Sequence, residues 1–442
     1  MENDGCEAKV LVAPVGDPSS WSHAIYECEN QNETKESYYS LVCAEKPDLA
    51  VLAVQDSIVF PTIALKNRNE LYDNCRTYTP CVSGSEIKSY RELAELAEQY
   101  STCVFSDFLK NIENKSIVVL PSLGQYEDRC EKRVMKFQSL ATPDIIRSLA
   151  TIKLYEKLKD LKCDRLIVNL DMTHGLNYFG SLIAQALKDA ASVLSISKKH
   201  IQIKYFSAIP VVQRKEYRYL KVMMSEMVRL VSYEDNLNYT LLNAIRFAID
   251  YNAPLLLLTY LYRHKEGFSE IEKDREEVEK KLTCLSDDFV KVEYNLEVLP
   301  HLITKFSNTY YYILLKEIRR NYRAEPDQKG YFAIEEVKNV GKNIFNFSEA
   351  SKDIILTELS VIERGGEEMK DGSVRLLKTL FKNIYEKDSE RHGESNEIRN
   401  FRAHAGLKKE FTKVKKHEDK LYLAYDIKKL QNFLSKHRFP AV

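Results

Sequence analysis

Residues 164–175 read Asp-Arg-Leu-Ile-Val-Asn-Leu-Asp-Met-Thr-His-Gly. Positions 164–172 form an apolar, β-branched run of strand length, and the stretch Leu176–Leu194 that follows has helical periodicity. A turn of small and polar residues lies between the two. A buried strand that runs through such a turn into a helix is the unit from which parallel α/β sheets are built.

Four further apolar runs in the first half of the chain have the same character. The predicted strands are Lys9–Val15, Asp48–Val54, Lys115–Leu120 and Ile201–Ser207. Helices are predicted between them, at Tyr90–Tyr100 and Pro143–Leu161. Strands that are apolar on both faces are typical of a sheet covered by helices on both sides. The sequence therefore predicts an N-terminal Rossmann-like parallel sheet.

Small or polar residues follow each predicted strand, at the edge of the sheet where open α/β folds bind ligands. The first strand is followed by Gly16, Asp17, Ser19, Ser20 and Trp21. The second is followed by Gln55-Asp56-Ser57, and the third by Pro121-Ser122-Leu123-Gly124. We expect these clusters to line one crevice.

The turn after the strand at 164–172 carries the most chemistry. Thr173 is placed to cap the following helix, and Gly175 allows a ligand to approach the backbone closely. The N-terminus of that helix suits a phosphodiester. His174 can donate to a phosphate or stack on a base, and Asp171 can orient His174 or bind a ribose hydroxyl. The alternative interpretation is that Thr173 is only a helix cap and His174 an ordinary loop histidine.

The second half of the chain has a different pattern. From Leu220 to Arg323 we find helical periodicity and almost no strand signal, with Met223, Met227, Leu230 and Val231 on one helical face. The predicted fold class is therefore α/β followed by all-α. The predicted domains are 1–220 (nucleotide sensing), 221–330 (helical linker or first part of the helical domain) and 331–442 (helical, catalytic).

Residues 395–406 read Ser-Asn-Glu-Ile-Arg-Asn-Phe-Arg-Ala-His-Ala-Gly. Ser395 is a plausible N-cap and Gly406 a plausible C-cap of a helix. Such a helix places Arg399 and His404 about a turn and a half apart. A surface arginine and a histidine at a helix end remain the alternative interpretation, because the R-x-x-x-x-H spacing is not specific by itself.

An arginine and a histidine together suit RNA transesterification. The 2′-hydroxyl must lose a proton, the leaving 5′-oxygen must gain one, and the phosphorane must be stabilised. His404 can transfer protons, Arg399 can clamp phosphate oxygens, and Asn400 can hold either group. No metal is required. Because one histidine cannot easily act as both acid and base, a two-fold dimer is chemically sensible.

Composition limits the other possibilities. The 442-residue chain has 65 basic and 65 acidic residues, so any nucleic-acid site must be a local patch. The basic segment Lys408–Lys416 can cradle an RNA backbone or be a solvated loop. The nine cysteines include no C-x-x-C pair, and we expect free thiols in a reducing cytosol. No signal peptide or membrane span is predicted.

The two motifs, in this order, resemble those of the CARF–HEPN family of CRISPR-associated ribonucleases from type III systems. In that family a Rossmann-like CARF domain carries a turn like Asp171–Gly175, and a helical HEPN domain carries R-x-x-x-x-H, here Arg399–His404. The stretch at 12–21, Val-Ala-Pro-Val-Gly-Asp-Pro-Ser-Ser-Trp, resembles the family's first ligand loop. The chain departs from the pattern at Ala405, where a second glycine would suit the turn better.

The resemblance implies a cytoplasmic homodimer, with assembly beyond the dimer left open. A cyclic oligoadenylate would bind across the CARF dimer, and the HEPN dimer would then cut single-stranded RNA and leave 2′,3′-cyclic phosphate ends. We favour cyclic tetra-adenylate as activator, although the sequence does not fix the ring size. The implied activator-binding residues are Ser19, Ser20, Trp21, Thr173, His174, Gly175 and Asn177. The implied catalytic residues are Arg399, Asn400 and His404, with no metal or cofactor.

Two alternatives stay open. In the first, the chain is a non-catalytic sensor whose helical half binds a partner or nucleic acid. In the second, the turn at Asp171, Thr173 and His174 slowly cleaves the cyclic ligand that the domain binds.

Overall fold

The computed structural model describes residues 6–16, 21, 23–28, 33–43, 46–59, 74–78, 89–128, 133–137, 143–174, 177–210, 217–281, 300–322, 325–381 and 394–442. The chain divides into two compact units. The first contains residues 1–228 and 274–310, and the second contains 229–273 and 311–442. The boundaries at 220/221 and 330/331 stay predictions. Within the described residues, no helix is long and apolar enough to cross a membrane.

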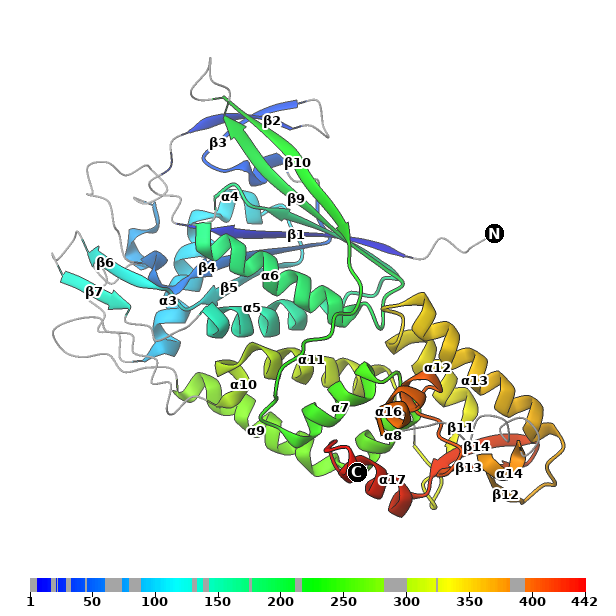
Figure 1. Cartoon of the computed structure of the whole chain (residues 1–442). Coiled ribbons are helices and arrows are strands. Elements are labelled where there is room, and N and C mark those ends of the chain that lie inside the picture. Colours follow the sequence, from blue (N-terminus) through cyan, green and yellow to red (C-terminus); the bar gives the residue numbers. More distant parts are fainter. Residues whose placement is uncertain are drawn as a thin grey trace. The chain divides into compact units, whose positions relative to one another are not determined.

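An eight-stranded sheet forms the centre of the first unit, in the order β3-β2-β10-β9-β8-β1-β4-β5 (Figure 1). Its strands are β1 (Glu7–Val15), β2 (Ala24–Cys28), β3 (Glu33–Ser37), β4 (Leu49–Gln55), β5 (Lys115–Leu120), β8 (Arg165–Asp171), β9 (His200–Pro210) and β10 (Tyr217–Met227). The five strands predicted from the sequence, β1, β4, β5, β8 and β9, are mutually parallel neighbours. The Rossmann-like prediction is confirmed.

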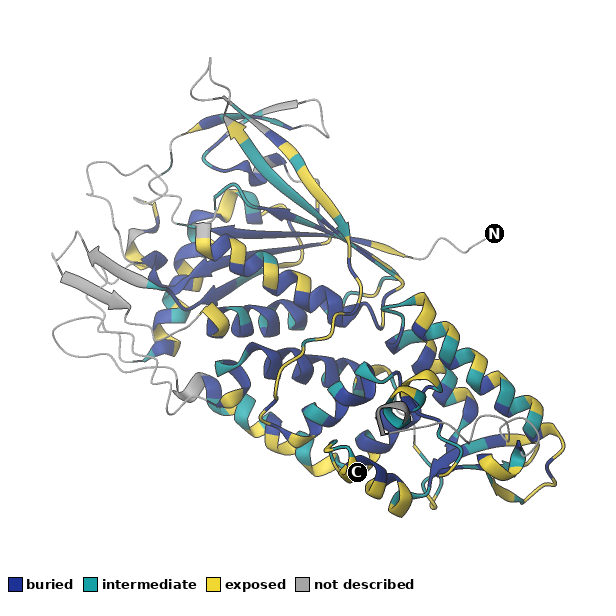
Figure 2. Ribbon diagram, viewed as in Figure 1, coloured by how far each residue is buried: buried dark blue, intermediate teal, exposed yellow. Residues whose placement is uncertain are grey.

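Helices cover the parallel part of this sheet, where β1 and β4 are buried along most of their length, whereas β10 is largely exposed (Figure 2). The helices of the unit are α3 (Tyr90–Val104), α4 (Ser106–Leu109), α5 (Pro143–Leu158), α6 (Asn177–Leu194) and α10 (His301–Thr304). Short 3₁₀ turns are η2 (Ser40–Cys43), η3 (Asp56–Val59) and η5 (Arg76–Tyr78), and a separate hairpin pairs β6 (Gly124–Asp128) with β7 (Arg133–Phe137).

The chain order of the parallel strands locates a topological switch point. From β1 the sheet grows through β4 to β5 on one side, and through β8 to β9 on the other. Right-handed crossovers therefore put α5 and α6 together on one face, as Figure 1 shows, and α3 on the opposite face. Ligands of such sheets bind where the order reverses, which is at the carboxyl ends of β1 and β8.

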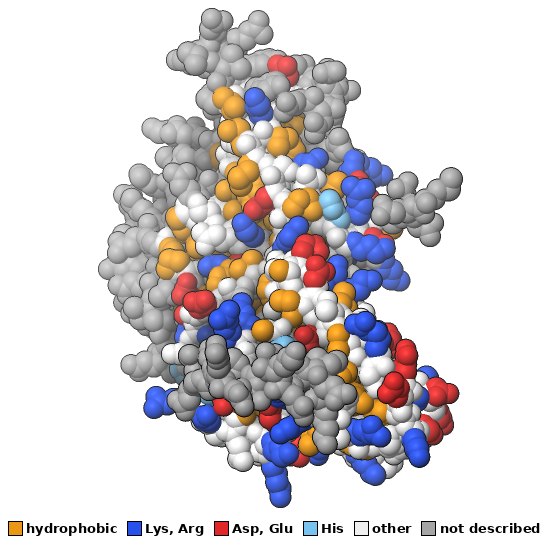
Figure 3. Space-filling model, turned by 45° about the vertical axis from the view of Figure 1, so that its right-hand side comes forward, with side chains coloured by type: hydrophobic (Ala, Val, Ile, Leu, Met, Phe, Trp, Pro, Cys, Tyr) orange, Lys and Arg blue, Asp and Glu red, His pale blue; other side chains and the backbone are white. Residues whose placement is uncertain are grey.

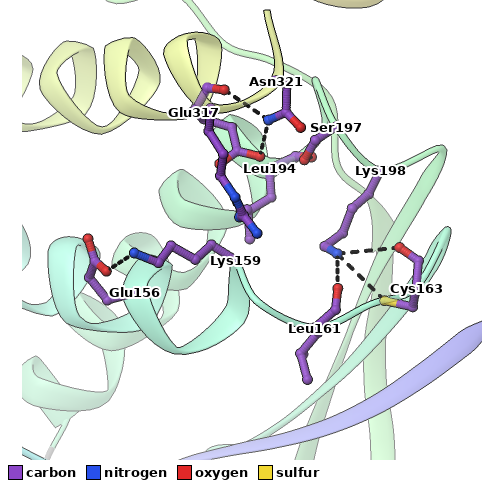
Figure 4. A network of polar contacts seen from close by, with 10 residues as sticks. Glu156, Lys159, Leu161, Cys163, Leu194, Ser197, Lys198, Glu317 and Asn321 are labelled. Atoms are coloured by element: carbon purple, nitrogen blue, oxygen red, sulfur yellow. Dashed lines mark hydrogen bonds and ion pairs between the residues drawn. The ribbon is translucent and has the colours of Figure 1, made fainter.

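A buried lysine, Lys198, fixes the amino end of β8 (Figure 4). The Lys198 ammonium donates to the carbonyl oxygen of Leu161 at 2.7 Å and to that of Cys163 at 3.3 Å. These bonds join the turn after α6 to the turn that leads into β8. The strand therefore begins at a defined position, which in turn positions Asp171 at its carboxyl end.

The prediction that helical structure begins at Leu220 is wrong. β10 continues to Met227 and pairs antiparallel with β9. The pairing register shifts between Val222 and Met224, and the neighbouring Met223 and Met224 side chains are both exposed. This bulge removes the alternation that marks a strand, so the methionine spacing imitates a helix.

The expectation of free thiols is also wrong in part. Cys28 is disulfide-bonded to Cys43, and Cys75 to Cys103. The partners are 15 and 28 residues apart in sequence, and the fold brings them together in a way that no local spacing reveals. Among the described cysteines, Cys6 and Cys163 are free.

The second unit is mainly helical. Its helices are α7 (Thr240–Asp250), α8 (Pro254–Arg263), α9 (Lys265–Lys281, whose end belongs to the first unit), α11 (Phe306–Asn321, whose start does), α12 (Ile334–Ile344), α13 (Glu349–Glu367), α14 (Leu377–Leu380), α16 (Glu394–Ala403) and α17 (Ile427–Lys436). A small sheet that the sequence did not suggest has the order β11 (Phe332–Ala333), β14 (Lys420–Tyr425), β13 (Thr412–His417) and β12 (Val374–Leu376).

Aromatic packing holds α16 in this unit. The Phe401 ring is fully buried, with its centroid 5.1 Å from that of Phe433 on α17 and 6.3 Å from that of Phe411. Because Phe401 lies between Arg399 and His404, this anchor fixes the backbone that carries both residues.

Candidate functional site

His174 lies just beyond the carboxyl end of β8, where its ring meets three other segments. The Trp21 ring stacks on it, with centroids 4.0 Å apart and planes inclined by 18°. The Ser40 N–H, at the start of η2, donates to Nε2 at 3.0 Å, and the Tyr26 hydroxyl on β2 lies 3.4 Å from the same nitrogen. Because a backbone N–H can only donate, Nε2 is unprotonated and the neutral ring carries its proton on Nδ1.

Asp171 reaches the histidine through Ser40 rather than directly. Its Oδ2 accepts from the Ser40 hydroxyl at 2.6 Å, and its Oδ1 accepts from the Thr173 N–H at 2.9 Å. The Thr173 hydroxyl accepts from the Ala208 N–H at 3.0 Å, so it ties the turn to β9. Thr173 thus contacts the sheet, and its predicted capping of the following helix stays a prediction, because residues 175–176 lie outside the described residues.

Burial governs the charge of this site. It lowers the pKa of His174 to about 4, against the opposing effect of the Asp171 carboxylate and with the help of the Arg218 guanidinium. Burial likewise raises the pKa of Tyr26 to about 12. Both groups are therefore neutral at pH 7. A neutral ring stacked on an indole is suited to a nucleobase more than to ionic capture of a phosphate.

Arg218 supplies the positive charge that the neutral histidine does not. It lies on β10 in register with Tyr26 of β2, and its charge acts on both Tyr26 and His174. Sequence reasoning missed Arg218 because no strand was predicted at β10. Ser40 was also missed, since nothing in its own segment marks it as a partner of a residue 134 positions away.

The other predicted activator residues divide into two groups. Gly16 belongs to the site, because its N–H donates to the His174 carbonyl oxygen at 3.1 Å. Trp21 does as well, through the stack on His174. Asn177 is the first residue of α6, and its side chain lies outside the described residues. Asp17, Ser19, Ser20 and Gly175 lie outside them entirely.

The polar residues after β4 and β5 do not line a crevice as expected. Asp56 and Ser122 are fully buried, and Asp56 Oδ1 accepts from the Ser122 N–H at 2.9 Å. The Ser122 hydroxyl lies 2.6 Å from that of Ser57. These groups satisfy one another and join the ends of two neighbouring strands, which is a structural role.

In the second unit, Arg399 is exposed and Asn400 half-buried on α16, and His404 lies in the turn after the helix. The helix already includes Glu394, so the prediction that Ser395 is its N-cap is wrong.

His404 Nδ1 lies 3.1 Å from Oε1 of Glu358 on α13, and the histidine side chain is 42% exposed. An ionised carboxylate only accepts, so Nδ1 carries a proton, and in the neutral ring Nε2 on the opposite edge is the unprotonated nitrogen. Sequence reasoning missed Glu358, which lies 46 residues away.

The turn that holds His404 depends on Gly406. This residue has φ +74°, its N–H donates to the Phe401 carbonyl oxygen at 2.8 Å, and it follows Ala405 at φ +53°. A Cβ on Gly406 would lie 2.6 Å from Ala253 Cβ and 3.2 Å from Ala253 Cα. The helix ends at Ala403 and Ala405 takes the left-handed position that ends it, so the predicted C-cap role of Gly406 is displaced by two residues, and Gly406 closes the turn through its bond to Phe401.

We expect Gly406→Ala to lower the free energy of unfolding by about 2–4 kcal/mol, because a left-handed alanine and a steric clash both oppose folding. Gly372→Ala is the matched control: Gly372 has φ +73°, and a Cβ added there would have nothing within 4 Å. It should lose only the backbone contribution, about 1–2 kcal/mol. Urea unfolding followed by circular dichroism measures both. Equal losses would show that Ala253 does not limit the space at Gly406.

The basic segment 408–416 is largely ion-paired. Lys415 contacts Asp327 at 2.7 Å, Lys413 contacts Asp426 at 3.3 Å, and both lysines lie on β13 rather than in a loop. On the face drawn in Figure 3, basic, acidic and hydrophobic side chains are mixed rather than segregated. No group of three or more His, Cys, Asp or Glu side chains in the described part of the chain could hold a metal ion.

A parallel sheet with a half-buried histidine at its switch point, together with a mainly helical unit that carries an Arg–His pair, defines a two-part protein with one candidate site in each part. Residues 10–210 match the family model of the CRISPR system endoribonuclease Csx1, CARF domain, and residues 348–429 match that of the Csx1 HEPN domain. The chain therefore belongs to the CARF–HEPN family of CRISPR-associated ribonucleases, as the motifs predicted.

One curated relative supports the same assignment. The chain is 26% identical over 209 residues to the CRISPR system endoribonuclease Csx1 of Methanocaldococcus jannaschii. The match covers 47% of this chain and 38% of the relative's length. His174 lies within the part matched to the CARF model, and Glu358, Arg399 and His404 lie within the part matched to the HEPN model.

Proposed function

We propose that this chain is a cyclic oligoadenylate-activated, metal-independent endoribonuclease that cuts single-stranded RNA in the cytoplasm, as part of type III CRISPR antiviral defence. The observation that carries the proposal is the pairing of His404 with Glu358 inside the HEPN-matched residues. In its neutral form, a histidine whose Nδ1–H is held by a carboxylate presents an unprotonated Nε2, which is the form needed to remove a proton from a 2′-hydroxyl.

Cleavage then follows from residues of this chain. His404 Nε2 takes the proton of the 2′-hydroxyl, and the 2′-oxygen attacks the adjacent phosphorus. The bond from phosphorus to the 5′-oxygen breaks, and the leaving oxygen takes up a proton. Arg399 stabilises the phosphorane charge, with Asn400 beside it. The products are a 2′,3′-cyclic phosphate and a 5′-hydroxyl.

The proposed active form is a homodimer. A second copy would bring a second His404 to protonate the leaving oxygen, so that one histidine need not serve as acid and base in the same step. A two-fold symmetric cyclic tetra-adenylate matches such a dimer, because both subunits present the same switch-point edge. Assembly beyond the dimer is not needed for this chemistry.

The activator pocket is assigned to the residues around His174. An adenine can stack beside the Trp21–His174 pair, and Arg218 supplies a cation for a neighbouring phosphate. Of the predicted residues, Gly16, Asp17, Ser19, Ser20, Thr173, Gly175 and Asn177 complete the proposed set. Both Asp171 oxygens and His174 Nε2 are already hydrogen-bonded, which argues against slow cleavage of the ring by this turn.

The test is RNA cleavage in EDTA, with labelled single-stranded RNA and with or without cyclic tetra-adenylate. We expect fragments with 2′,3′-cyclic phosphate ends only when the ring is present. Linear tetra-adenylate is the matched control and should give none. Loss of cleavage in EDTA that magnesium restores would refute the metal-independent mechanism. Absence of fragments with rings of four and six adenylates would favour the non-catalytic sensor.

A further inference from the structure

A small separate core lies beneath η2, the turn that carries Ser40. It consists of Ala24, Tyr26, Cys28, Cys43 and Leu220, with Phe206 and Ala208 partly buried against it. Two of these side chains are the partners of one disulfide. So small a core buries little apolar surface, and the disulfide adds a covalent restraint to it.

This disulfide joins the two segments that hold His174. Cys28 lies on β2 two positions after Tyr26, and Cys43 ends the η2 turn that begins at Ser40. Ser40 donates from its N–H to His174 and from its hydroxyl to Asp171. Opening the disulfide therefore removes the covalent link between β2 and the segment that supplies these two hydrogen bonds.

We propose that Cys28 and Cys43 form a thiol–disulfide switch for the His174 pocket. In the oxidised form η2 is clamped against His174, and the pocket is preorganised for a base. In the reduced form η2 can leave, Ser40 no longer holds His174 and Asp171, and water reaches the ring. The consequence for activator affinity rests on the proposed function, whereas the opening of the pocket does not.

The switch needs only a thiol reductant. A thiolate of the reductant attacks one cysteine sulfur and forms a mixed disulfide, and the second thiol of the reductant then releases it. Cys28 and Cys43 gain two electrons and two protons in total, and the dithiol is oxidised to its own disulfide. Both cysteines are buried, with 2% and 6% exposure, so we expect exchange to be slow and limited by opening of η2.

Trp21 provides a direct readout, because it is the single tryptophan of the chain and stacks on His174. A protonated imidazole in such a stack quenches indole fluorescence. The charged or titratable groups around His174 are Asp171 on β8, Tyr26 on β2 and Arg218 on β10. Burial outweighs them and holds the pKa of His174 at about 4, so exposure to water should move that pKa up toward its ordinary value of 6.5.

The experiment is a fluorescence titration of the full chain from pH 7.5 to 3.5, with circular dichroism to exclude unfolding. Oxidised protein should show quenching centred near pH 4. After reduction with dithiothreitol, verified by alkylation and mass spectrometry, the midpoint should rise by about one to two pH units. Cys28→Ala/Cys43→Ala should show the higher midpoint without reductant. Cys75→Ala/Cys103→Ala, which removes the other disulfide, should keep the lower one.

An unchanged midpoint in both the reduced protein and Cys28→Ala/Cys43→Ala would overturn the proposal. The same samples are then tested for binding of cyclic tetra-adenylate at pH 7.5. We expect opening of the disulfide to weaken binding about tenfold, since the pocket loses its preorganisation. If no sample binds the ring while the midpoint still shifts, the proposed activator is wrong and the switch stands.

Discussion

His404→Ala is expected to slow RNA cleavage by about 10²–10⁴-fold, the usual contribution of a general base or acid. The variant loses the imidazole that takes the 2′-hydroxyl proton in the proposed mechanism, while Arg399 and Asn400 keep their places on α16. Single-turnover cleavage of labelled RNA at saturating cyclic tetra-adenylate measures the loss. Activator binding should not change, because His404 and His174 belong to different units.

His417→Ala is the matched control for this experiment. His417 is an exposed histidine on β13 in the same unit, and its removal should leave the cleavage rate within about twofold. If His404→Ala cleaves RNA as fast as His417→Ala, the assignment of the catalytic site to α16 cannot be maintained.

The sequence predicts the parallel part of the sheet well, and most clearly β1 and β4, which are buried on both faces. A strand that is buried on both faces has an uninterrupted run of apolar residues, and such a run can be recognised in the sequence alone. β10 lacks this signal because its bulge exposes adjacent methionines, and the two-residue strand β11 is too short to show any period.

The residues of the candidate sites also fall into two groups, those that a local motif indicates and those that only the fold brings together. His174 and the Arg399–His404 pair can be named as candidates from the sequence, since each lies in a short local motif. Ser40 and Glu358 cannot, because they reach their histidines through the fold, across 134 and 46 residues respectively. Arg218 depends on the register of β10 against β2, which only the three-dimensional structure provides.

Glu358→Ala is expected to reduce kcat for RNA cleavage about ten- to a hundredfold, similar to removing a partner that orients a functional histidine. Without the carboxylate at 3.1 Å, nothing at that position accepts the Nδ1 proton of His404, and the fraction of molecules with Nε2 directed at the substrate and unprotonated falls. KM for RNA should change little, because Glu358 acts through His404. The measurement is a full rate-against-RNA curve at saturating activator.

Glu358→Gln separates orientation from general disruption of α13. The amide oxygen of glutamine can still accept from Nδ1–H, so this variant should recover most of the rate lost in Glu358→Ala. Glu363→Ala is the control on the same helix, because Glu363 pairs with Lys338 instead of His404. A positioning role requires that glutamine rescues kcat and that the Glu363 variant keeps it. If Ala and Gln at 358 are equally slow, the carboxylate charge matters more than the hydrogen bond, and if neither is slow, His404 is oriented by something else.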